Sequence, residues 1–232
     1  MKVAVLKFPG TNCDEDVLHV LRNVLKVDAN IVWHEHFKAD SFDAAILPGG
    51  FSYGDYLRAG AIAAHSPSVK QLELMDDDCK PILGICNGFQ ILVEAGLLPG
   101  ALLLNSTLTF ICKWVHLRVE KTDTAFTNLF KTGQVVKMPI AHKEGRFFAD
   151  ERTLKRISER IVLRYCDENG RVTEEYNPNG STENIAGICD KDGNIVGLMP
   201  HPERASEKIL SGNFPDGLLM FKSMLKWMRE NE

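Results

Sequence analysis

Short apolar runs that alternate with segments of helical periodicity characterise the chain as far as Pro99. Residues 2–8 have the composition of a buried strand, and residues 14–26 carry apolar side chains at the spacing of a helix face. The same alternation predicts strands at residues 29–33, 43–47 and 81–85, and helices at residues 57–65, 67–75 and 88–95. Strands that alternate with helices build a parallel sheet, so we expect a doubly wound α/β fold.

Beyond Pro99 the pattern changes to strands joined mainly by turns. Turn sequences such as Asn177-Pro178-Asn179-Gly180 predict hairpins that extend or flank the parallel sheet. A closing helix at residues 216–229 has a broad apolar stripe. We find no repeat or convincing boundary, so we expect a single domain over residues 1–232, with a mostly parallel sheet and added antiparallel strands. The later strands are predicted at residues 101–104, 112–119, 134–140, 161–165, 185–189 and 195–199.

Composition limits the partners and the compartment. The chain has 232 residues, of which 44% are hydrophobic, enough for one sizeable core. Its net charge of -4 gives no basic field for nucleic acid or for an anionic membrane. The N-terminus runs directly into a predicted strand, no apolar stretch reaches membrane-spanning length, and the cysteines show no paired spacing. We therefore expect a cytoplasmic protein.

The sequence Gly84-Ile85-Cys86-Asn87-Gly88 offers the chemistry of a nucleophile. It follows a predicted buried strand and enters a predicted helix, which is the pattern of a nucleophile elbow with cysteine in place of serine. At a helix N-terminus the backbone N–H groups and the helix dipole favour a thiolate and can bind an oxyanion. Cys86 is therefore the candidate nucleophile for acyl transfer.

A candidate base follows the last predicted strand of the sheet, in Pro200-His201-Pro202-Glu203. His201 would take the proton of the Cys86 thiol and return it to the leaving group, while Glu203 would orient the imidazole. Pro48-Gly49-Gly50 follows a third strand, and the N–H groups of Gly50 and Asn87 could together form an oxyanion hole. Sites form at the carboxyl edge of an open α/β sheet, where all three motifs are expected.

Other candidate residues are less specific. His142 has Glu144 two residues later, so spacing alone does not separate this pair from His201 and Glu203. The sequence His34-Glu35-His36 could place two imidazoles on one strand face, but no third ligand is fixed near it, and we interpret it as a solvated strand end rather than a metal site. The other cysteines have no glycine frame and are interpreted as structural or incidental: Cys13, Cys79, Cys112, Cys166 and Cys189.

Taken together, the Gly-x-Cys-x-Gly-x-Gln sequence at Cys86, the strand-end Pro-Gly-Gly and the late His-Pro-Glu resemble the class I, triad-type glutamine amidotransferases. This resemblance covers essentially the whole chain and implies a flavodoxin-like fold. It implies that Cys86 forms a glutamyl thioester, that His201 and Glu203 complete a Cys-His-Glu triad, and that Gln90 contacts the amino-acid end of glutamine. It also places His142 and Glu144 at the substrate pocket or an interface. Less firmly, Asn105, Ser106 and Phe110 would border the glutamine site.

Three longer strings resemble one branch of this family, the glutaminase subunits of phosphoribosylformylglycinamidine synthases. They span residues 7–14, 48–60 and 139–147. This resemblance implies a synthetase partner and a small accessory subunit, with ammonia delivered for the conversion of formylglycinamide ribonucleotide in purine biosynthesis. It implies no cofactor in this chain, and ATP and magnesium in the synthetase partner. The aromatic and cationic residues of the second string suit either a protein interface or loop packing: Phe51, Tyr53, Tyr56 and Arg58.

Three other interpretations stay open at this level. A cysteine hydrolase, chaperone or peptidase on a related fold would leave Gln90 and the His-Pro-Glu sequence unexplained. A regulatory module without activity would have little reason to retain Cys86, His201 and Glu203. A glutaminase that serves another synthetase, in pyridoxal phosphate or histidine biosynthesis, is disfavoured by the Gly-Phe-Ser-Tyr-Gly-Asp-Tyr string at Gly50.

Overall fold

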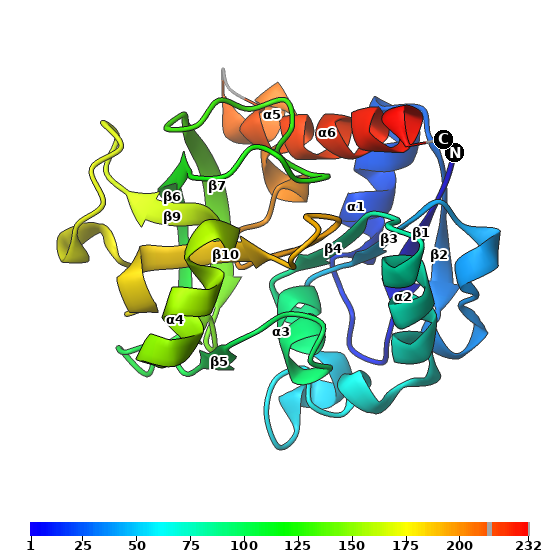
Figure 1. Ribbon diagram of the computed structural model, residues 1–232, viewed down its shortest axis with the longest axis horizontal. Helices are drawn as coiled ribbons and strands as arrows, with labels where there is room; N and C mark the ends of the chain where they lie inside the picture. Colours follow the sequence, from blue (N-terminus) through cyan, green and yellow to red (C-terminus); the bar gives the residue numbers. More distant parts are fainter. Residues whose placement is uncertain (213–214, 232) are drawn as a thin grey trace.

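The computed structural model describes residues 1–212 and 215–231 and contains one large sheet (Figure 1). Nine strands lie in the order β2-β1-β3-β4-β11-β10-β9-β6-β7, and β5 and β8 form a separate pair. The strands are β1 Lys2–Lys7, β2 Asp28–Trp33, β3 Ala44–Leu47, β4 Ile82–Ile85, β5 Ala101–Leu103, β6 Ile111–Val119, β7 Val135–His142, β8 Arg146–Phe148, β9 Ile161–Cys166, β10 Ile185–Cys189 and β11 Ile195–Leu198.

The sheet has a parallel half and an antiparallel half. Strands β2, β1, β3, β4 and β11 pair in parallel, whereas β10, β9, β6 and β7 continue the sheet in antiparallel fashion. This confirms the expected doubly wound α/β fold with added antiparallel strands. The change in direction follows from the chain, because β10 and β11 are joined by a short turn and can only pair as a hairpin.

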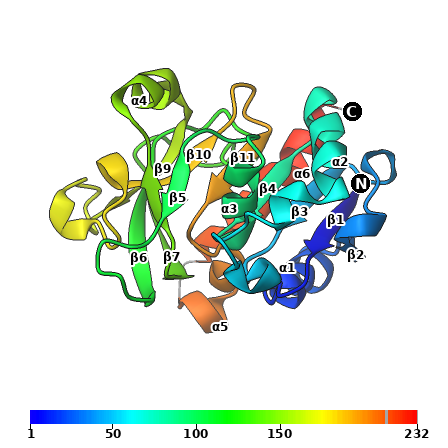
Figure 2. The ribbon, with the colours of Figure 1, turned by 90° about the horizontal axis from the view of Figure 1, so that it is seen from below.

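Helices cover both faces of the parallel half (Figures 1 and 2). Helices α1 and α6 lie on one face, and α2 and α3 lie on the other. Ser66 caps α2 with its side chain, which accepts a hydrogen bond from the N–H of Ser68. The helices are α1 Asp14–His19, continued as a π-helical segment Val20–Val24, α2 Pro67–Asp77, α3 Asn87–Glu94, α4 Glu151–Ile157, α5 Lys208–Ser211 and α6 Asp216–Glu230.

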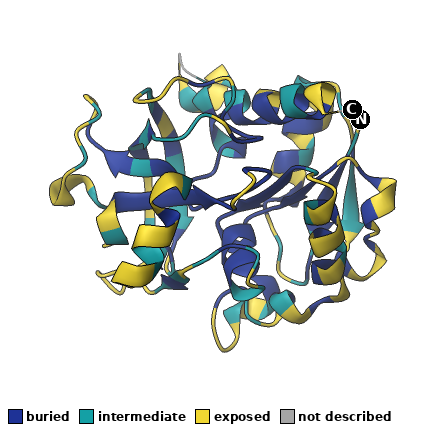
Figure 3. Cartoon of the chain, in the orientation of Figure 1, coloured by how far each residue is buried: buried dark blue, intermediate teal, exposed yellow. Residues whose placement is uncertain are grey.

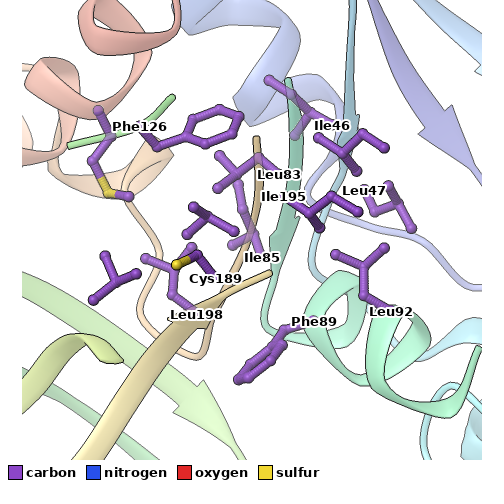
Figure 4. Close-up of a cluster of buried hydrophobic side chains, with 14 of the residues drawn as sticks. Ile46, Leu47, Leu83, Ile85, Phe89, Leu92, Phe126, Cys189, Ile195 and Leu198 are labelled. Atoms are coloured by element: carbon purple, nitrogen blue, oxygen red, sulfur yellow. The ribbon is translucent and has the colours of Figure 1, made fainter. Parts of the chain in front are cut away.

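The core lies between the sheet and these helices. Strands β3, β4 and β11 are buried at every residue, as expected for parallel strands covered on both faces. Figure 3 shows the buried sheet and the exposed outer faces of the helices. In Figure 4, Leu83 and Ile195 of neighbouring strands pack together, and Phe89 and Leu92 of α3 lie beneath them. The nucleophile elbow is thus built on a strand that is buried at every residue.

Two local predictions were wrong, and three elements were missed. Residues 57–65 do not form a helix, because Leu57 and Gly60 have left-handed backbones (φ 68° and 81°) that interrupt helical geometry, and only a 3₁₀ turn remains at Ala63–His65. The segment His34–His36 is also a 3₁₀ turn, and His34 is buried rather than solvated. The sequence analysis missed β8, α4 and α5. None of the helices described is long and apolar enough to cross a membrane.

Candidate active site

The elbow holds Cys86 in a strained backbone conformation between β4 and α3. Its φ of 50° and ψ of -104° lie outside the regions that residues with a side chain usually adopt. The flanking glycines permit this turn. A Cβ atom on Gly88 would lie 1.9 Å from the carbonyl oxygen of Leu47, so only glycine lets α3 approach β3 this closely. The elbow geometry predicted from the glycine spacing is therefore present.

The parallel sheet brings the three predicted motifs together. Strand β4 pairs with β3 on one side and with β11 on the other, and the loops that leave their carboxyl ends meet above the sheet. The Pro48-Gly49-Gly50 loop lies against the imidazole of His201, because a Cβ on Gly49 would lie 2.7 Å from Cε1 of that ring. Residues that are far apart in sequence thus line one site.

His201 and Glu203 form a buried dyad. Nδ1 of His201 lies 2.6 Å from Oε1 of Glu203, and each residue is only 2% exposed. Burial by itself lowers the pKa of His201, but the Glu203 carboxylate and the neighbouring thiols of Cys13 and Cys86 outweigh it, so the pKa lies well above its ordinary value. A cationic His201 stabilises negative charge on the Cys86 sulfur, which is the form that attacks a carbonyl carbon.

The two proposed oxyanion donors flank Cys86. Gly50 bridges to Thr11 through hydrogen bonds from Asn12 N–H to Gly49 O (3.3 Å) and from Phe51 N–H to Gly10 O (2.9 Å). Neither of these two bonds uses the N–H of Gly50 as its donor. Asn87 is the first residue of α3, so its N–H has no partner within the helix. Their role in an oxyanion hole remains a prediction.

The side chain of Asn87 connects the elbow to the loop after β3. Its Oδ1 accepts a hydrogen bond from the N–H of Ser52 at 3.0 Å, and its Nδ2 donates to Oε1 of Gln90 at 2.9 Å. Gln90 in turn donates from Nε2 to the carbonyl oxygen of Glu144. Gln90 lines the pocket, but both ends of its amide are engaged within the protein. The contact of Gln90 with glutamine stays a prediction.

His142 and Glu144 are not a second dyad. Nδ1 of His142 lies 3.0 Å from Oδ1 of Asn105, and Glu144 instead accepts a hydrogen bond from the N–H of Ala59 at 3.3 Å. Burial and the charge of His201 lower the pKa of His142 to about 4, so it is neutral near pH 7 and a poor base. Both residues line a cavity of about 280 Å³ that also contains Cys86. The geometry therefore favours His201 as the base.

Comparison with known proteins agrees with this site. A family model described as a CobB/CobQ-like glutamine amidotransferase domain matches residues 1–228. The chain belongs to this family. The phosphoribosylformylglycinamidine synthase subunit PurQ of Methanosarcina barkeri is 57% identical to this amidotransferase over all of both chains. The protein of the same name from Aquifex aeolicus is 51% identical, covering 97% of this chain and 99% of its own.

A solved structure extends the comparison to the fold. One chain in the structure of PurLQS from Thermotoga maritima superposes with a TM-score of 0.85 at 44% identity, covering 98% of each chain. A glutamine amidotransferase from the same organism has a TM-score of 0.59 at 16% identity, which shows a shared fold. The amidotransferase fold predicted from the sequence is therefore confirmed.

The sequence analysis missed two residues beside the dyad. Sγ of Cys13 accepts a hydrogen bond from Nη2 of Arg204 at 3.2 Å, and Nε of Arg204 lies 3.9 Å from Oε1 of Glu203. Ligand atoms of Cys13, His201 and Glu203 lie within 4.8 Å of one another, but the adjacent guanidinium cation disfavours a metal ion there. The sequence pattern indicates only a structural or incidental role for Cys13. The only sequence signal for a role of Cys13 is its position directly before a predicted helix and shortly after the first predicted strand.

Outside the site, the remaining histidine candidate has a packing role. Nδ1 of His34 lies 2.7 Å from Oγ of Ser66, and its Nε2 lies 3.2 Å from the hydroxyl of Tyr53. Its ring stacks on Phe8 with centroids 5.0 Å apart. Tyr53 therefore anchors the loop after β3, whereas Phe51 and Tyr56 are exposed. Of the predicted loop residues, Phe51, Tyr56 and Arg58 have the exposure that an interface needs.

Proposed function

We propose that this chain is the glutaminase subunit of phosphoribosylformylglycinamidine synthase. The observation that carries the proposal is the 57% identity, over the full length of both chains, to a relative with that enzyme's name. The chain hydrolyses L-glutamine and delivers ammonia to a synthetase subunit. That subunit converts formylglycinamide ribonucleotide to formylglycinamidine ribonucleotide with ATP, in de novo purine biosynthesis.

The geometry of the site supports a thioester mechanism. Sγ of Cys86 attacks the side-chain amide carbon of glutamine, and the N–H groups of Gly50 and Asn87 receive the negative charge that develops on its oxygen. His201 then donates a proton to the leaving nitrogen, and ammonia departs as the glutamyl thioester forms. A water molecule, deprotonated by His201, hydrolyses the thioester and releases glutamate. Glu203 holds the imidazole through Nδ1 in both steps.

The partners follow from the same relatives. The Thermotoga maritima structure carries the name PurLQS, and we infer a synthetase subunit and a small accessory subunit for this chain as well. We place ATP and magnesium in the synthetase partner and no cofactor in this chain. We place the reaction in the cytoplasm, because all six cysteines are free thiols, which a reducing compartment preserves.

Glutamate release by the purified chain, alone and with its partners loaded with ATP and formylglycinamide ribonucleotide, tests this function. We expect Cys86→Ala to abolish release while the variant still folds and joins the complex. Cys166→Ala provides the matched control, because Cys166 is also a buried free thiol but lies in β9, away from the dyad. Release that ignores the loaded partner would contradict the assignment to purine synthesis and leave the amidotransferase chemistry intact.

A further inference from the structure

Another cavity, of about 520 Å³, lies away from the nucleophile. It is bounded by the end of α3 and the segment after it, by α4 and by the turn between β10 and β11. In that turn the carbonyl oxygen of Asn194 accepts a hydrogen bond from the N–H of Ile82, where β4 begins, whereas Cys86 follows the end of β4. In Figure 2, α4 and α5, which follows the dyad in the chain, lie at opposite edges. This cavity is therefore at the edge of the sheet opposite Cys86.

Cationic side chains surround this cavity and a neighbouring one of about 370 Å³. Arg156, Arg160 and Lys191 line both cavities. Together the two linings hold five cations but only three acids, whereas the whole chain has a net charge of -4. The cations are Lys121, Lys155, Arg156, Arg160 and Lys191, and the acids are Asp76, Glu159 and Asp190. The protein therefore concentrates positive charge here against its overall sign.

The acids do not neutralise the two arginines. Asp190 is buried, and both of its carboxylate oxygens accept hydrogen bonds from backbone N–H groups within residues 192–195, at 2.8 to 3.0 Å. In the part of the chain that the structure describes, no carboxylate oxygen lies within 4.0 Å of a side-chain nitrogen of Arg156 or Arg160. Nη2 of Arg156 only donates a long hydrogen bond, of 3.5 Å, to Oγ1 of Thr153. Both guanidinium groups are therefore available to an anion.

The larger cavity also has an apolar part, which comes mainly from α3 and the segment after it. Its apolar side chains are those of Val93, Leu97, Leu98, Pro99 and Ile157. Asp76 adds a carboxylate acceptor for N–H or O–H groups of a ligand. A volume of about 520 Å³ is typical of small-molecule sites. The two cavities together thus combine an apolar surface for a ring with cations for an attached anionic group.

We propose that these two cavities bind a nucleotide, with its base against the apolar side chains and its phosphates at Arg156 and Arg160. The planar guanidinium group matches the geometry of phosphate oxygens and binds them through paired, charge-assisted hydrogen bonds. Helix α3 extends for about 10 Å between the elbow and this cavity, so the nucleotide would not meet the reacting atoms. It would be an effector rather than a substrate, and the proposal goes beyond the glutaminase function.

Calorimetry of the full chain with ADP, adenosine and inorganic pyrophosphate tests the site, because these probes separate the base from the phosphates. We expect ADP to bind with a Kd below about 1 mM, and each of the other two to bind at least about tenfold more weakly. Arg156→Gln and Arg160→Gln should each weaken ADP binding about tenfold, the effect of losing a charge-assisted hydrogen bond. Leu97→Gln should weaken the binding of ADP but not of pyrophosphate. Arg152→Gln, which alters an exposed arginine of α4 outside both cavities, should keep the affinity for ADP.

Three outcomes would overturn the inference. The first is no binding of ADP at millimolar concentration, above all if the two arginine variants then weaken assembly with the synthetase subunit, which would assign the arginines to a protein contact. The second is equal affinity for ADP and pyrophosphate, which would indicate a surface that attracts any anion. The third is unchanged ADP affinity in both arginine variants. Thermal unfolding of each variant shows whether a loss reflects misfolding, and because the readout is binding, the result does not depend on glutaminase activity.

Discussion

At the level of single residues, the site combines strain with unusual electrostatics. Cys86 has a backbone conformation that glycine tolerates and other residues resist, and its side chain is only 5% exposed. His201 has a raised pKa because Glu203 lies in contact with it and outweighs the effect of burial, whereas burial and the charge of His201 lower the pKa of the equally buried His142. The two histidines thus differ through their neighbours, which their sequence spacing does not reveal.

The strain at Cys86 gives a prediction about stability. Cys86→Gly and Cys86→Ala both remove the nucleophile, but only glycine relieves the positive φ, so the glycine variant should unfold at higher denaturant concentration. We expect a difference of about 1–2 kcal/mol in the free energy of unfolding, measured by urea titration. Equal stabilities would show that the elbow is not strained.

Asp55 gives a second prediction, which depends on pH. Its pKa of about 6 in the folded chain exceeds its ordinary 3.8, so the stabilising contribution of its protonated form is complete below about pH 4 and is lost as the pH rises through 6. Asp55→Asn should therefore stabilise the chain at pH 8 by about 1–2 kcal/mol, a figure reduced because the side chain is half-exposed, and should have no effect near pH 4.

Urea titration of the free chain at both pH values measures this effect. Glu73→Gln is the control, because Glu73 is an exposed acid in the middle of α2, outside the cavity lining, and this variant should have the same stability as the unaltered chain at pH 4 and pH 8. If Asp55→Asn gives no gain at pH 8, neither burial nor the charge of Glu144 destabilises the ionised carboxylate of Asp55.

At the level of elements, the close approach of α3 to the sheet sets the position of the nucleophile. Gly88 contacts Leu47 of β3, and a Cβ on Gly84 would lie 2.8 Å from the carbonyl of Gly88. The sequence predicted β4, α3 and their elbow because the apolar run and the glycines are local signals. It failed at residues 57–65, where apolar spacing suggested a helix but Leu57 and Gly60 turn the chain to meet α3.

Gly88→Ala should therefore be severely destabilising. Its Cβ has no space against the backbone of Leu47, so α3 must move away from the sheet, and we expect a loss of more than about 3 kcal/mol together with loss of glutaminase activity. Gly96→Ala is the control: its Cβ would meet nothing within 4 Å, and the variant should lose only about 1 kcal/mol for its positive φ of 77°. Similar losses in both would exclude close packing at the elbow.

At the level of the whole molecule, exposed apolar side chains surround the mouth of the catalytic cavity. Phe51 and Phe110 line the cavity, with ring centroids 6.5 Å apart. Tyr56 and Leu57 project from the neighbouring loop, and Leu57 is 93% exposed. Because this loop also braces Asn87 through Ser52, a partner bound here would act directly on the elbow. We interpret this surface as the contact for the synthetase subunit.

Leu57→Asp should weaken assembly with the synthetase subunit by about tenfold or more without unfolding the chain, because aspartate tolerates the left-handed backbone at this position. Binding of the two subunits can be measured by calorimetry. Leu74→Asp places the same change on α2, at a leucine that is 51% exposed and outside the cavity lining. If both variants assemble normally, the partner binds a different face.

The sequence by itself determined the alternation of strands and helices, the elbow at Cys86 and the candidates His201, Glu203 and Gly50, because glycine spacing and apolar runs act over a few residues. The role expected for Gln90 came from the family resemblance. The tertiary structure decided which histidine meets a carboxylate, that Cys13 and Arg204 adjoin the dyad, and that Asp55 and Glu144 share a cavity. These facts depend on the pairing of β3, β4 and β11 and on the backbone of the loops between elements. Contacts between segments distant in sequence arise from packing, which leaves no periodic signal in the chain.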